Sequence, residues 1–271
     1  MKKVALSGAG GIVGGILRRG LQRKGVDLRC AGWQPLEPLH PGEDLVHGDL
    51  RDPAVVDRLL AGVDVLIHLA GSSVERPLPE IIDNNLRALY EVYEGARRHG
   101  VKRVVFASSN HAFGMYRTTD RLKLDAPFRP DGLYGLSKVW GEAMARMYWD
   151  KHGIEGISLR IGTAMGQPPE NARQLSTWLG SEDLLQLAMR CIEAGPVGCA
   201  AVWGISANTR AWYDLAEGNA IGYAPVENAE RWAGEVLARP DPLDAIARTF
   251  QGGSFASHDY TAPLPAAGER A

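Results

Sequence analysis

A tyrosine and a lysine four residues apart, Tyr134 and Lys138, have the residue types and the spacing for proton transfer. In a helix this spacing places both side chains on one face. A phenol has a pKa of about 10 and is a poor base at neutral pH, but an ammonium group about 4 Å away favours the phenolate by roughly 4 kcal/mol, or about three pKa units. The pair is therefore a candidate general base, although the same spacing also occurs on helix surfaces without a catalytic role.

A serine upstream could complete such a site. Ser109 follows the apolar run Arg103–Ser108, which has the composition of a buried strand. At the end of that strand its hydroxyl could hydrogen-bond the hydroxyl from which Tyr134 removes a proton. We therefore assign Ser109, Tyr134 and Lys138 as the candidate catalytic set.

Three glycines near the amino terminus could bind a phosphate group. Gly8, Gly11 and Gly14 follow the apolar run Lys3–Ser7 and precede a segment with helical spacing. Glycine lets the backbone turn and admits a pyrophosphate close to the N–H groups at the start of a helix. A tight strand-to-helix turn without a ligand is the alternative, and the strand before and helix after favour nucleotide binding.

The elements around these residues alternate between strand and helix, which predicts an α/β fold with a doubly wound parallel sheet of the Rossmann type. We expect six strands, at Lys3–Ser7, Asp27–Ala31, Asp44–His47, Val63–Leu69, Arg103–Ser108 and Gly156–Ile161. We expect helices at Gly11–Lys24, Pro53–Ala61, Pro79–His99 and Tyr134–His152.

The composition changes after Thr163, and this predicts the domain organisation. Residues 1–163 would form the nucleotide-binding core with the catalytic helix, and residues 164–255 a small C-terminal substrate lobe. In this lobe we expect a helix at Ser181–Glu193 that is capped by Ser181. Residues 256–271 are rich in Ala and Pro and are expected to form a mobile tail.

Charge and cysteine content narrow the function classes. The 30 Lys and Arg residues nearly balance 32 Asp and Glu residues, so we expect no nucleic-acid partner. Cys30, Cys191 and Cys199 lack the spacing of a disulfide framework or a zinc site, so we expect no metal and a cytoplasmic location. No apolar run is long enough to cross a membrane. The glycine-rich start, followed directly by Arg18 and Arg19, argues against a secretory signal.

The spacing Gly8-x-x-Gly11-x-x-Gly14, together with Tyr134 and Lys138, resembles that of the extended short-chain dehydrogenase/reductases. This resemblance implies NAD as the cofactor. It also implies a set of cofactor-binding residues, namely Gly8, Gly11, Ile12, Gly14, Trp33, Asp49, Leu50, Leu69, Ala70, Gly71, Asn85, Tyr134, Lys138 and Ile161.

The second strand departs from the pattern expected for NAD. An acidic residue at its end usually binds the ribose 2′-hydroxyl, whereas this chain continues as Gly32-Trp33-Gln34. Trp33 could stack on adenine and Gln34 could hydrogen-bond the ribose. Neither side chain repels a 2′-phosphate, so NAD is favoured but NADP stays open.

A narrower resemblance is to the uronate dehydrogenases, which oxidise the C1 hydroxyl of a cyclic hexuronic acid to a lactone. The strings that carry it are Ser73-Val74-Glu75-Arg76-Pro77, Ala107-Ser108-Ser109-Asn110-His111, Arg129-Pro130-Asp131-Gly132-Leu133-Tyr134-Gly135, Arg160-Ile161-Gly162, Leu175-Ser176-Thr177-Trp178 and Gln251-Gly252-Gly253. The resemblance implies a substrate pocket made of Ser73, Ser109, Asn110, His111, Tyr134, Thr163 and Arg173. Thr163 stands where that family typically has serine, and the loop Met165–Glu170 departs from its pattern.

Arg173 is the residue that would select the substrate, because an arginine–carboxylate hydrogen bond contributes about 1.5 to 3 kcal/mol. A solvated loop arginine is its alternative reading, and another anionic sugar, such as a sulfonated hexose, would satisfy the same group. His111 is either a pocket hydrogen-bonder or a structural imidazole.

Other functions share the same fold. A C1 dehydrogenase of a neutral aldose, a nucleotide-sugar epimerase or dehydratase, and an NAD sensor without turnover all remain alternatives. Dehydratases place an Asp-Glu pair where this chain has Asn110-His111, and the segment after Thr163 is short for gripping a nucleotide diphosphate. By family likeness, the two long predicted helices would pair in a homodimer or a higher homo-oligomer.

Overall fold

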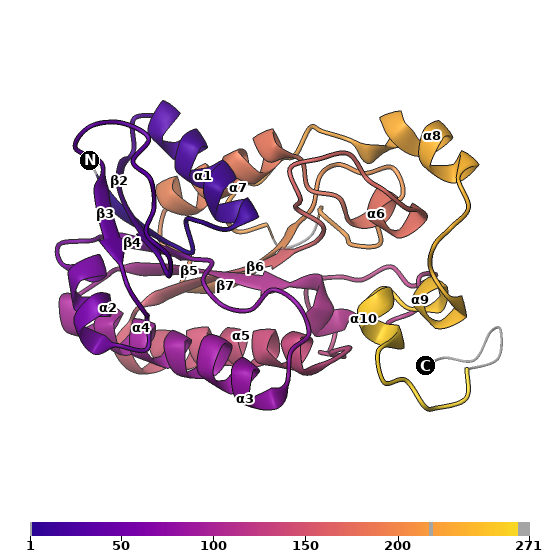
Figure 1. Cartoon of the computed structure of the whole chain (residues 1–271), viewed down its shortest axis with the longest axis horizontal. Helices are drawn as coiled ribbons and strands as arrows, with labels where there is room; N and C mark the ends of the chain where they lie inside the picture. Colours follow the sequence, from indigo (N-terminus) through magenta and orange to yellow (C-terminus); the bar gives the residue numbers. More distant parts are fainter. Residues whose placement is uncertain (1, 217–218, 265–271) are drawn as a thin grey trace.

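The computed structural model describes residues 2–216 and 219–264 and contains one parallel sheet with helices on both faces (Figure 1). The strands are β1 (Lys3–Ser7), β2 (Asp27–Gly32), β3 (Asp44–His47), β4 (Val65–His68), β5 (Arg103–Ser109), β6 (Glu155–Ile161) and β7 (Cys199–Gly204). Their order in the sheet is β3-β2-β1-β4-β5-β6-β7. The order reverses between β1 and β4, which is where α/β sheets of this kind bind ligands. The predicted Rossmann-type fold is confirmed.

The prediction of six strands is wrong by one, because the described chain has a seventh. β7 pairs with β6 from Gly156↔Cys199 to Ile161↔Gly204. Its sequence, Cys-Ala-Ala-Val-Trp-Gly, contains a single β-branched residue, so it lacks the usual composition of a strand. Strand β4 is the opposite case: all four of its residues are buried and three are Val, Leu or Ile.

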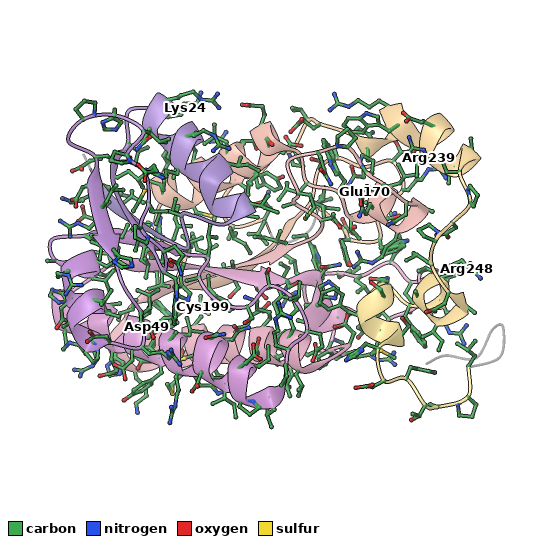
Figure 2. All side chains as sticks on the ribbon, in the orientation of Figure 1. Lys24, Asp49, Glu170, Cys199, Arg239 and Arg248 are labelled. Atoms are coloured by element: carbon green, nitrogen blue, oxygen red, sulfur yellow. The ribbon has the colours of Figure 1, made fainter. Side chains whose placement is uncertain are left out.

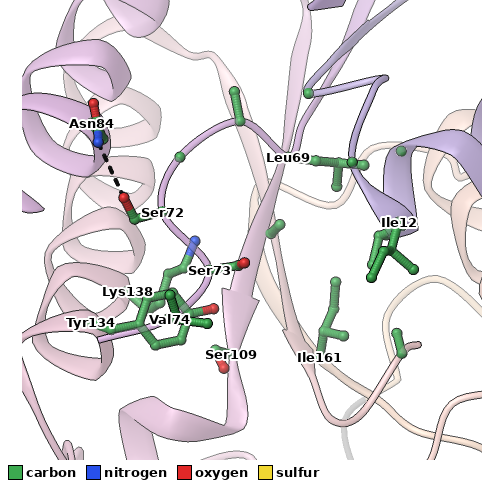
Figure 3. Close-up of a pocket in the computed structure, with 18 of the residues that line it drawn as sticks. Ile12, Leu69, Ser72, Ser73, Val74, Asn84, Ser109, Tyr134, Lys138 and Ile161 are labelled. Atoms are coloured by element: carbon green, nitrogen blue, oxygen red, sulfur yellow. Dashed lines mark hydrogen bonds between the residues drawn. The ribbon is translucent and has the colours of Figure 1, made fainter. Parts of the chain in front are cut away.

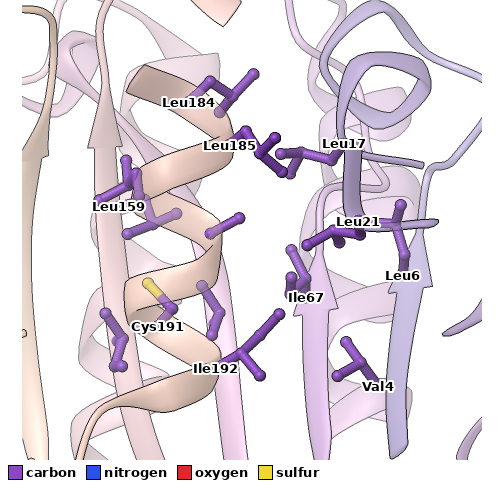
Figure 4. Packing of buried hydrophobic residues seen from close by; sticks show 14 of the residues in the cluster. Val4, Leu6, Leu17, Leu21, Ile67, Leu159, Leu184, Leu185, Cys191 and Ile192 are labelled. Carbon is purple, nitrogen blue, oxygen red and sulfur yellow. The ribbon is translucent and has the colours of Figure 1, made fainter. Parts of the chain in front are cut away.

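The helices form two layers on the sheet (Figure 1). Helices α1 (Ile12–Arg23) and α7 (Ser181–Glu193) cover one face, and α2 (Pro53–Leu60), α4 (Ala88–His99) and α5 (Leu133–His152) cover the other. Figure 4 shows Leu17 and Leu21 of α1 facing Leu185 and Ile192 of α7. Burial of this apolar surface, at about 25 cal/mol per Å², is what holds the layer on the sheet.

The helix predicted over Pro79–His99 is confirmed as a continuous helical segment, but a π-helical turn interrupts its regular hydrogen bonding. A short α3 (Leu78–Ile81) leads into a π-helical turn at Ile82–Arg87, and α4 begins at Ala88. π-Helical turns are rare and are frequent at functional sites. Here the wide turn carries Asn84 and Asn85, whose side chains both bond to Ser72.

The chain after Thr163 is not a separate lobe throughout, which corrects the division predicted at 163/164. Its α7 packs against α1 and its β7 joins the sheet. Only α6 (Ala172–Thr177), the 3-10 turn Ala229–Trp232, α8 (Ala233–Ala238), α9 (Ala245–Thr249) and α10 (Ser254–Ser257) gather at the end of the molecule opposite β3 (Figure 1). Figure 2 places Glu170, Arg239 and Arg248 on this part, far from Asp49.

Two further expectations for this region need correction. Ser181 is the first residue of α7 and not its cap: the N-cap is Gly180, and the carboxylate of Glu227 accepts from the backbone N–H groups of Glu182 and Asp183 at 3.0 and 3.1 Å. The predicted tail cannot begin at Ala256, which is buried in α10. Residues 265–271 of that tail lie outside the described residues.

Two features are absent from residues 2–216 and 219–264. None of the helices in these ranges is long and apolar enough to span a bilayer, and none of their His, Cys, Asp and Glu side chains form a group of three or more that could hold a metal ion.

Candidate active site

A cavity of about 1110 Å³ opens at the carboxyl ends of the strands and collects most of the predicted site residues (Figure 3). Those that line it are Gly8, Gly11, Ile12, Gly14, Trp33, Asp49, Leu50, Leu69, Ala70, Gly71, Ser73, Ser109, His111, Tyr134, Lys138, Ile161, Thr163 and Arg173. Among the predicted residues, only Asn85 and Asn110 are absent from the lining.

The glycine turn at one end of the cavity is shaped to accept a pyrophosphate. Gly8 has φ +72°, a conformation that L side chains rarely adopt, and a Cβ on Gly14 would overlap the carbonyl of Gly8. Gly11 is the N-cap of α1, and neither a side-chain cap nor an acidic residue occupies this helix start. The N–H groups and positive dipole end of α1 are thus left for an anionic ligand, so the residues fit a dinucleotide.

Ser109, Tyr134 and Lys138 meet at the other side of the cavity (Figure 3). The Lys138 ammonium lies 5.3 Å from the centre of the Tyr134 ring and 5.1 Å from that of Phe106. The Ser109 hydroxyl hydrogen-bonds the Tyr134 phenol and accepts the N–H of His111 at 3.1 Å. Strand β5 and helix α5 therefore bring all three predicted catalytic side chains together.

The pKa values of Tyr134 and Lys138 differ from those expected from the sequence. Burial raises the pKa of Tyr134 to about 12, although the hydrogen bond from Ser109 opposes the rise. Burial also lowers the pKa of Lys138 to about 8. The prediction that Lys138 brings the pKa of the phenol down is wrong for the chain by itself, because both groups lie in a low-dielectric site that disfavours charge. Further positive charge is needed before Tyr134 can act as a base near neutral pH.

Glu75 fixes the start of the catalytic helix. Its carboxylate oxygens accept the backbone N–H groups of Leu133 and Tyr134 at 2.9 and 3.0 Å. The N-cap of α5 is Gly132, which has no side chain to do this. Glu75 therefore ties the loop that carries Ser73 to the first turn of α5.

Asn85 lies behind the cavity wall, where it braces the Ser72 loop. Its side-chain oxygen accepts the N–H of Ser72 at 2.7 Å, and its amide donates to the carbonyl of Ser72 and to the hydroxyl of Ser137. Asn84, which the sequence analysis missed, does line the cavity and donates to the Ser72 hydroxyl (Figure 3).

Asn110 also lies behind the wall, since it is almost fully buried. Its amide donates to the hydroxyl of Tyr213 at 3.3 Å, and its side-chain oxygen lies 3.4 Å from the Ser109 hydroxyl. It is thus placed to orient Ser109.

His111 lines the cavity and contacts two residues that sequence reasoning did not assign. Its Nδ1 lies 2.6 Å from Oδ2 of Asp131, and its ring stacks on Phe255 at 4.0 Å between centroids. Asp131 and the Gln251-Gly252-Gly253 segment before Phe255 belong to the strings that carried the family resemblance. Their presence in those strings was the available signal, but nothing in the sequence placed them beside His111.

Arg173 presents a buried, partly unpartnered guanidinium. Its Nε donates to the carbonyl of Gln251 at 2.7 Å, while one terminal nitrogen is buried with no hydrogen-bond partner among the described residues. Burial lowers the pKa of this side chain. An unsatisfied buried donor is costly, so the geometry suits an anion that enters the cavity.

Thr163 lies between β6 and α6, on the same side of the cavity as Arg173. Its hydroxyl is 2.8 Å from that of Thr177, and its backbone forms a bridge with Trp178. The side chain is therefore held in one orientation at the cavity edge.

The cavity is also lined by the residues predicted to contact the adenosine part of the cofactor. Trp33, with 57 % of its surface exposed, extends from the end of β2, and the guanidinium of Arg51 lies 5.4 Å from its ring centre. The carboxylate of Asp49 accepts the backbone N–H and the Nε of Arg51 at 2.9 and 2.8 Å.

Comparisons with known proteins agree with this geometry. The model of the NAD dependent epimerase/dehydratase family matches residues 4–213. A uronate dehydrogenase of Agrobacterium fabrum is 44 % identical over 94 % of this chain and 97 % of its own, and one of Pseudomonas putida is 42 % identical over 94 % and 95 %. The crystal structure of a mutant of Agrobacterium tumefaciens uronate dehydrogenase complexed with NAD is 43 % identical, with a TM-score of 0.89 over 95 % of this chain and 97 % of that one.

These findings confirm the resemblance to uronate dehydrogenases that the sequence indicated. The matched length also covers every element of the sheet and most of the cavity described above. The chain therefore belongs to the NAD dependent epimerase/dehydratase family.

Proposed function

We propose that this protein is an NAD-dependent dehydrogenase that oxidises the C1 hydroxyl of a cyclic hexuronic acid to the aldarolactone. The observation that carries the proposal is that one cavity is lined by Tyr134 and Lys138, by a glycine turn that suits a phosphate, and by Arg173 with its buried, partly unpartnered guanidinium. The relatives named uronate dehydrogenase support the same substrate class.

The cofactor would supply the redox chemistry: when bound, its oxidised nicotinamide would accept the hydride and would bring a positive charge. The task of Tyr134 is to take the proton of the C1 hydroxyl. Its own pKa of about 12 is too high for this, and the added cation favours the phenolate.

Lys138 and Ser109 support the tyrosine in different ways. Lys138, with its pKa lowered to about 8, gives up a proton more readily than an ordinary lysine and so can relay one from Tyr134 toward solvent. Ser109 is fixed by the N–H of His111 and hydrogen-bonds both the phenol and the substrate hydroxyl.

Arg173 would bind the substrate carboxylate through the terminal nitrogen that has no other partner among the described residues. A charge-assisted bond of this kind contributes about 1.5 to 3 kcal/mol. His111, held by Asp131 and Phe255, offers its second ring nitrogen to a sugar hydroxyl. Ser73 and Thr163 add hydroxyl groups to the polar lining.

The decisive experiment measures NADH formation from glucuronate and galacturonate, with neutral and sulfonated hexoses in parallel. Tyr134→Phe should lower turnover by about 10²- to 10⁴-fold while NAD binding is kept. Arg173→Met should lower kcat/KM on uronates by about 10- to 100-fold and leave the neutral hexose unchanged. Near wild-type turnover in Tyr134→Phe would overturn the mechanism. Binding of NAD without net NADH release on any free sugar would point instead to an epimerase or a sensor.

We also propose that the protein works in the cytoplasm as a homo-oligomer. Its cysteines are free, and two of them are buried. Tyr90 of α4 and Trp140 and Met147 of α5 expose large apolar surfaces, which a second copy of the chain would cover. Light scattering of wild type and Trp140→Glu tests this, because the charged variant should shift to monomer.

A further inference from the structure

The end of strand β2 has no room for the residue that usually restricts such a site to NAD. In NAD-specific sites an acidic side chain here binds the 2′-hydroxyl of the adenosine ribose and repels a 2′-phosphate. The strand ends at Gly32. A Cβ built on Gly32 would lie 2.8 Å from the carbonyl oxygen of Gln34 and 3.0 Å from the side chain of Leu36. A carboxylate-bearing residue at this position would therefore require the loop that follows to shift.

A cation stands beside this gap. The guanidinium of Arg51 lies over the ring of Trp33, the residue that follows Gly32, and both line the cavity. Arginine near the end of the second strand is the group that accommodates a 2′-phosphate in sites for NADP. Its planar fork can bind a phosphate through two N–H groups at once.

Two carboxylates also contact Arg51 and would compete with a phosphate for its N–H donors. Asp49 holds Nε and one terminal nitrogen at 2.8 and 2.7 Å, and Asp83 lies 3.3 Å from the other terminal nitrogen. These contacts use three of the five N–H donors of the guanidinium. Two donors remain, and Asp83 is the more distant of the two carboxylates, so the arginine is held in place without being saturated.

We propose that the adenosine end of the cavity accepts a 2′-phosphate, so that the chain binds NADP as well as NAD, with Arg51 as the residue that determines this. The proposal rests on the nucleotide site of the proposed function but not on its substrate. It assigns a role to two features that the NAD chemistry leaves unused, Gly32 in place of an acidic residue and Arg51 beside Trp33.

The test measures binding of ADP-ribose and 2′-phospho-ADP-ribose to the purified full chain by calorimetry. Neither probe carries nicotinamide, so the readout is independent of turnover. The two affinities should agree within about tenfold, and only that of the 2′-phosphorylated probe should fall steeply as salt rises. Arg51→Gln should weaken the 2′-phosphorylated probe by about 10- to 100-fold and ADP-ribose by less than about threefold.

Arg87→Gln is the matched control. Arg87 pairs with the same carboxylate, Asp83, but does not line the cavity, so both probes should bind this variant as they bind wild type. A 2′-phosphorylated probe more than about 100-fold weaker than ADP-ribose, or equal weakening of both by Arg51→Gln, would overturn the inference. If both probes bind as expected but no uronate is oxidised, the proposed function fails and the cofactor inference stands.

Discussion

The imidazole of His111 and the carboxylate of Asp131 meet at 2.6 Å, and the side chain of Asp131 is fully buried. Because an ionised carboxylate can only accept, Nδ1 of His111 carries the hydrogen and Nε2 is left for a ligand. A Cβ on Gly114 or on Gly252 would overlap the Asp131 carboxylate, so this side chain has a single place to go.

Asp131→Asn should lower kcat/KM on the preferred uronate by about 10- to 100-fold with unchanged NAD affinity, because the amide can hold the imidazole in the wrong tautomer. Steady-state kinetics across pH check this, and a changed pH profile would mark a positioning role. Asp150→Asn, on the exposed side of α5 and paired with Arg146, is the control and should have no effect. Unaltered kinetics in Asp131→Asn would contradict the assignment.

Glu75→Gln should reduce both stability and turnover. The amide leaves only one acceptor for the two N–H groups at the start of α5, and loss of a helix cap costs about 1 kcal/mol, or roughly 2 to 4 °C in Tm for a chain of this size. Calorimetry and kinetics test the two effects together. Glu80→Gln, an exposed residue of α3, should change neither. A stability loss with full turnover would limit Glu75 to a structural role.

Lys138→Met should be more stable than wild type and less active. Burial lowers the folded-state pKa of Lys138 to about 8 from an ordinary value near 10.5, so the unfolded chain binds more protons between those values and stability rises with pH across that window. Below about pH 8 the full cost of burying the charged Lys138 applies, and it lowers the free energy of unfolding by at most about 3 kcal/mol. In denaturant unfolding, the variant should have the higher free energy of unfolding at pH 7, and the two proteins should have equal values above about pH 10.5.

The same substitution should lower kcat by about 10²- to 10⁴-fold. In wild type the oxidation rate should rise with pH through about 8, the pKa of Lys138, and this rise should be missing from the variant. Since Tyr134 and Lys138 are adjacent, the measured value describes the pair. An identical pH profile in both proteins would show that Lys138 takes no part in the proton path.

Gly253→Ala should impair recognition of the substrate carboxylate. Gly253 has φ +63°, and a Cβ there would lie 2.5 Å from Cδ and 2.8 Å from Nε of Arg173. The variant should raise KM for uronates more than for a neutral hexose and destabilise the fold by about 1 kcal/mol or more. Gly234→Ala in α8, where the added carbon meets nothing within 4 Å, should be neutral or stabilising. A uniform KM increase would argue against an effect through Arg173.

The parts of this architecture that depend on local sequence could be predicted, and those that depend on long-range packing could not. Strand β4 and the glycine turn are evident because their signals, an apolar run and a Gly spacing, lie within a few residues. Strand β7 has no such signal and forms because β6 offers it an unpaired edge.

The candidate active site shows the same contrast between residues with a local sequence signal and residues placed by long-range packing. Tyr134, Lys138 and Ser109 were identified from spacing on a helix and from the end of a strand, whereas Phe255 reaches His111 from a distant part of the chain. The altered pKa values were missed for a similar reason. A Coulomb estimate for two neighbours contains their attraction, but the loss of water around Tyr134 is produced by the whole fold.

The π-helical turn at Ile82–Arg87 has two structural roles. Its asparagines anchor Ser72 through side-chain bonds, and its wide turn takes up one residue more than an α-helical turn before α4 enters the core. Deleting a single residue there would restore a regular helix and leave the phase of α4 nearly unchanged. Val92 and Tyr93 would then keep the sheet face that they fill, so the asparagine anchor of the Ser72 loop can change while the packing of α4 on the sheet is preserved.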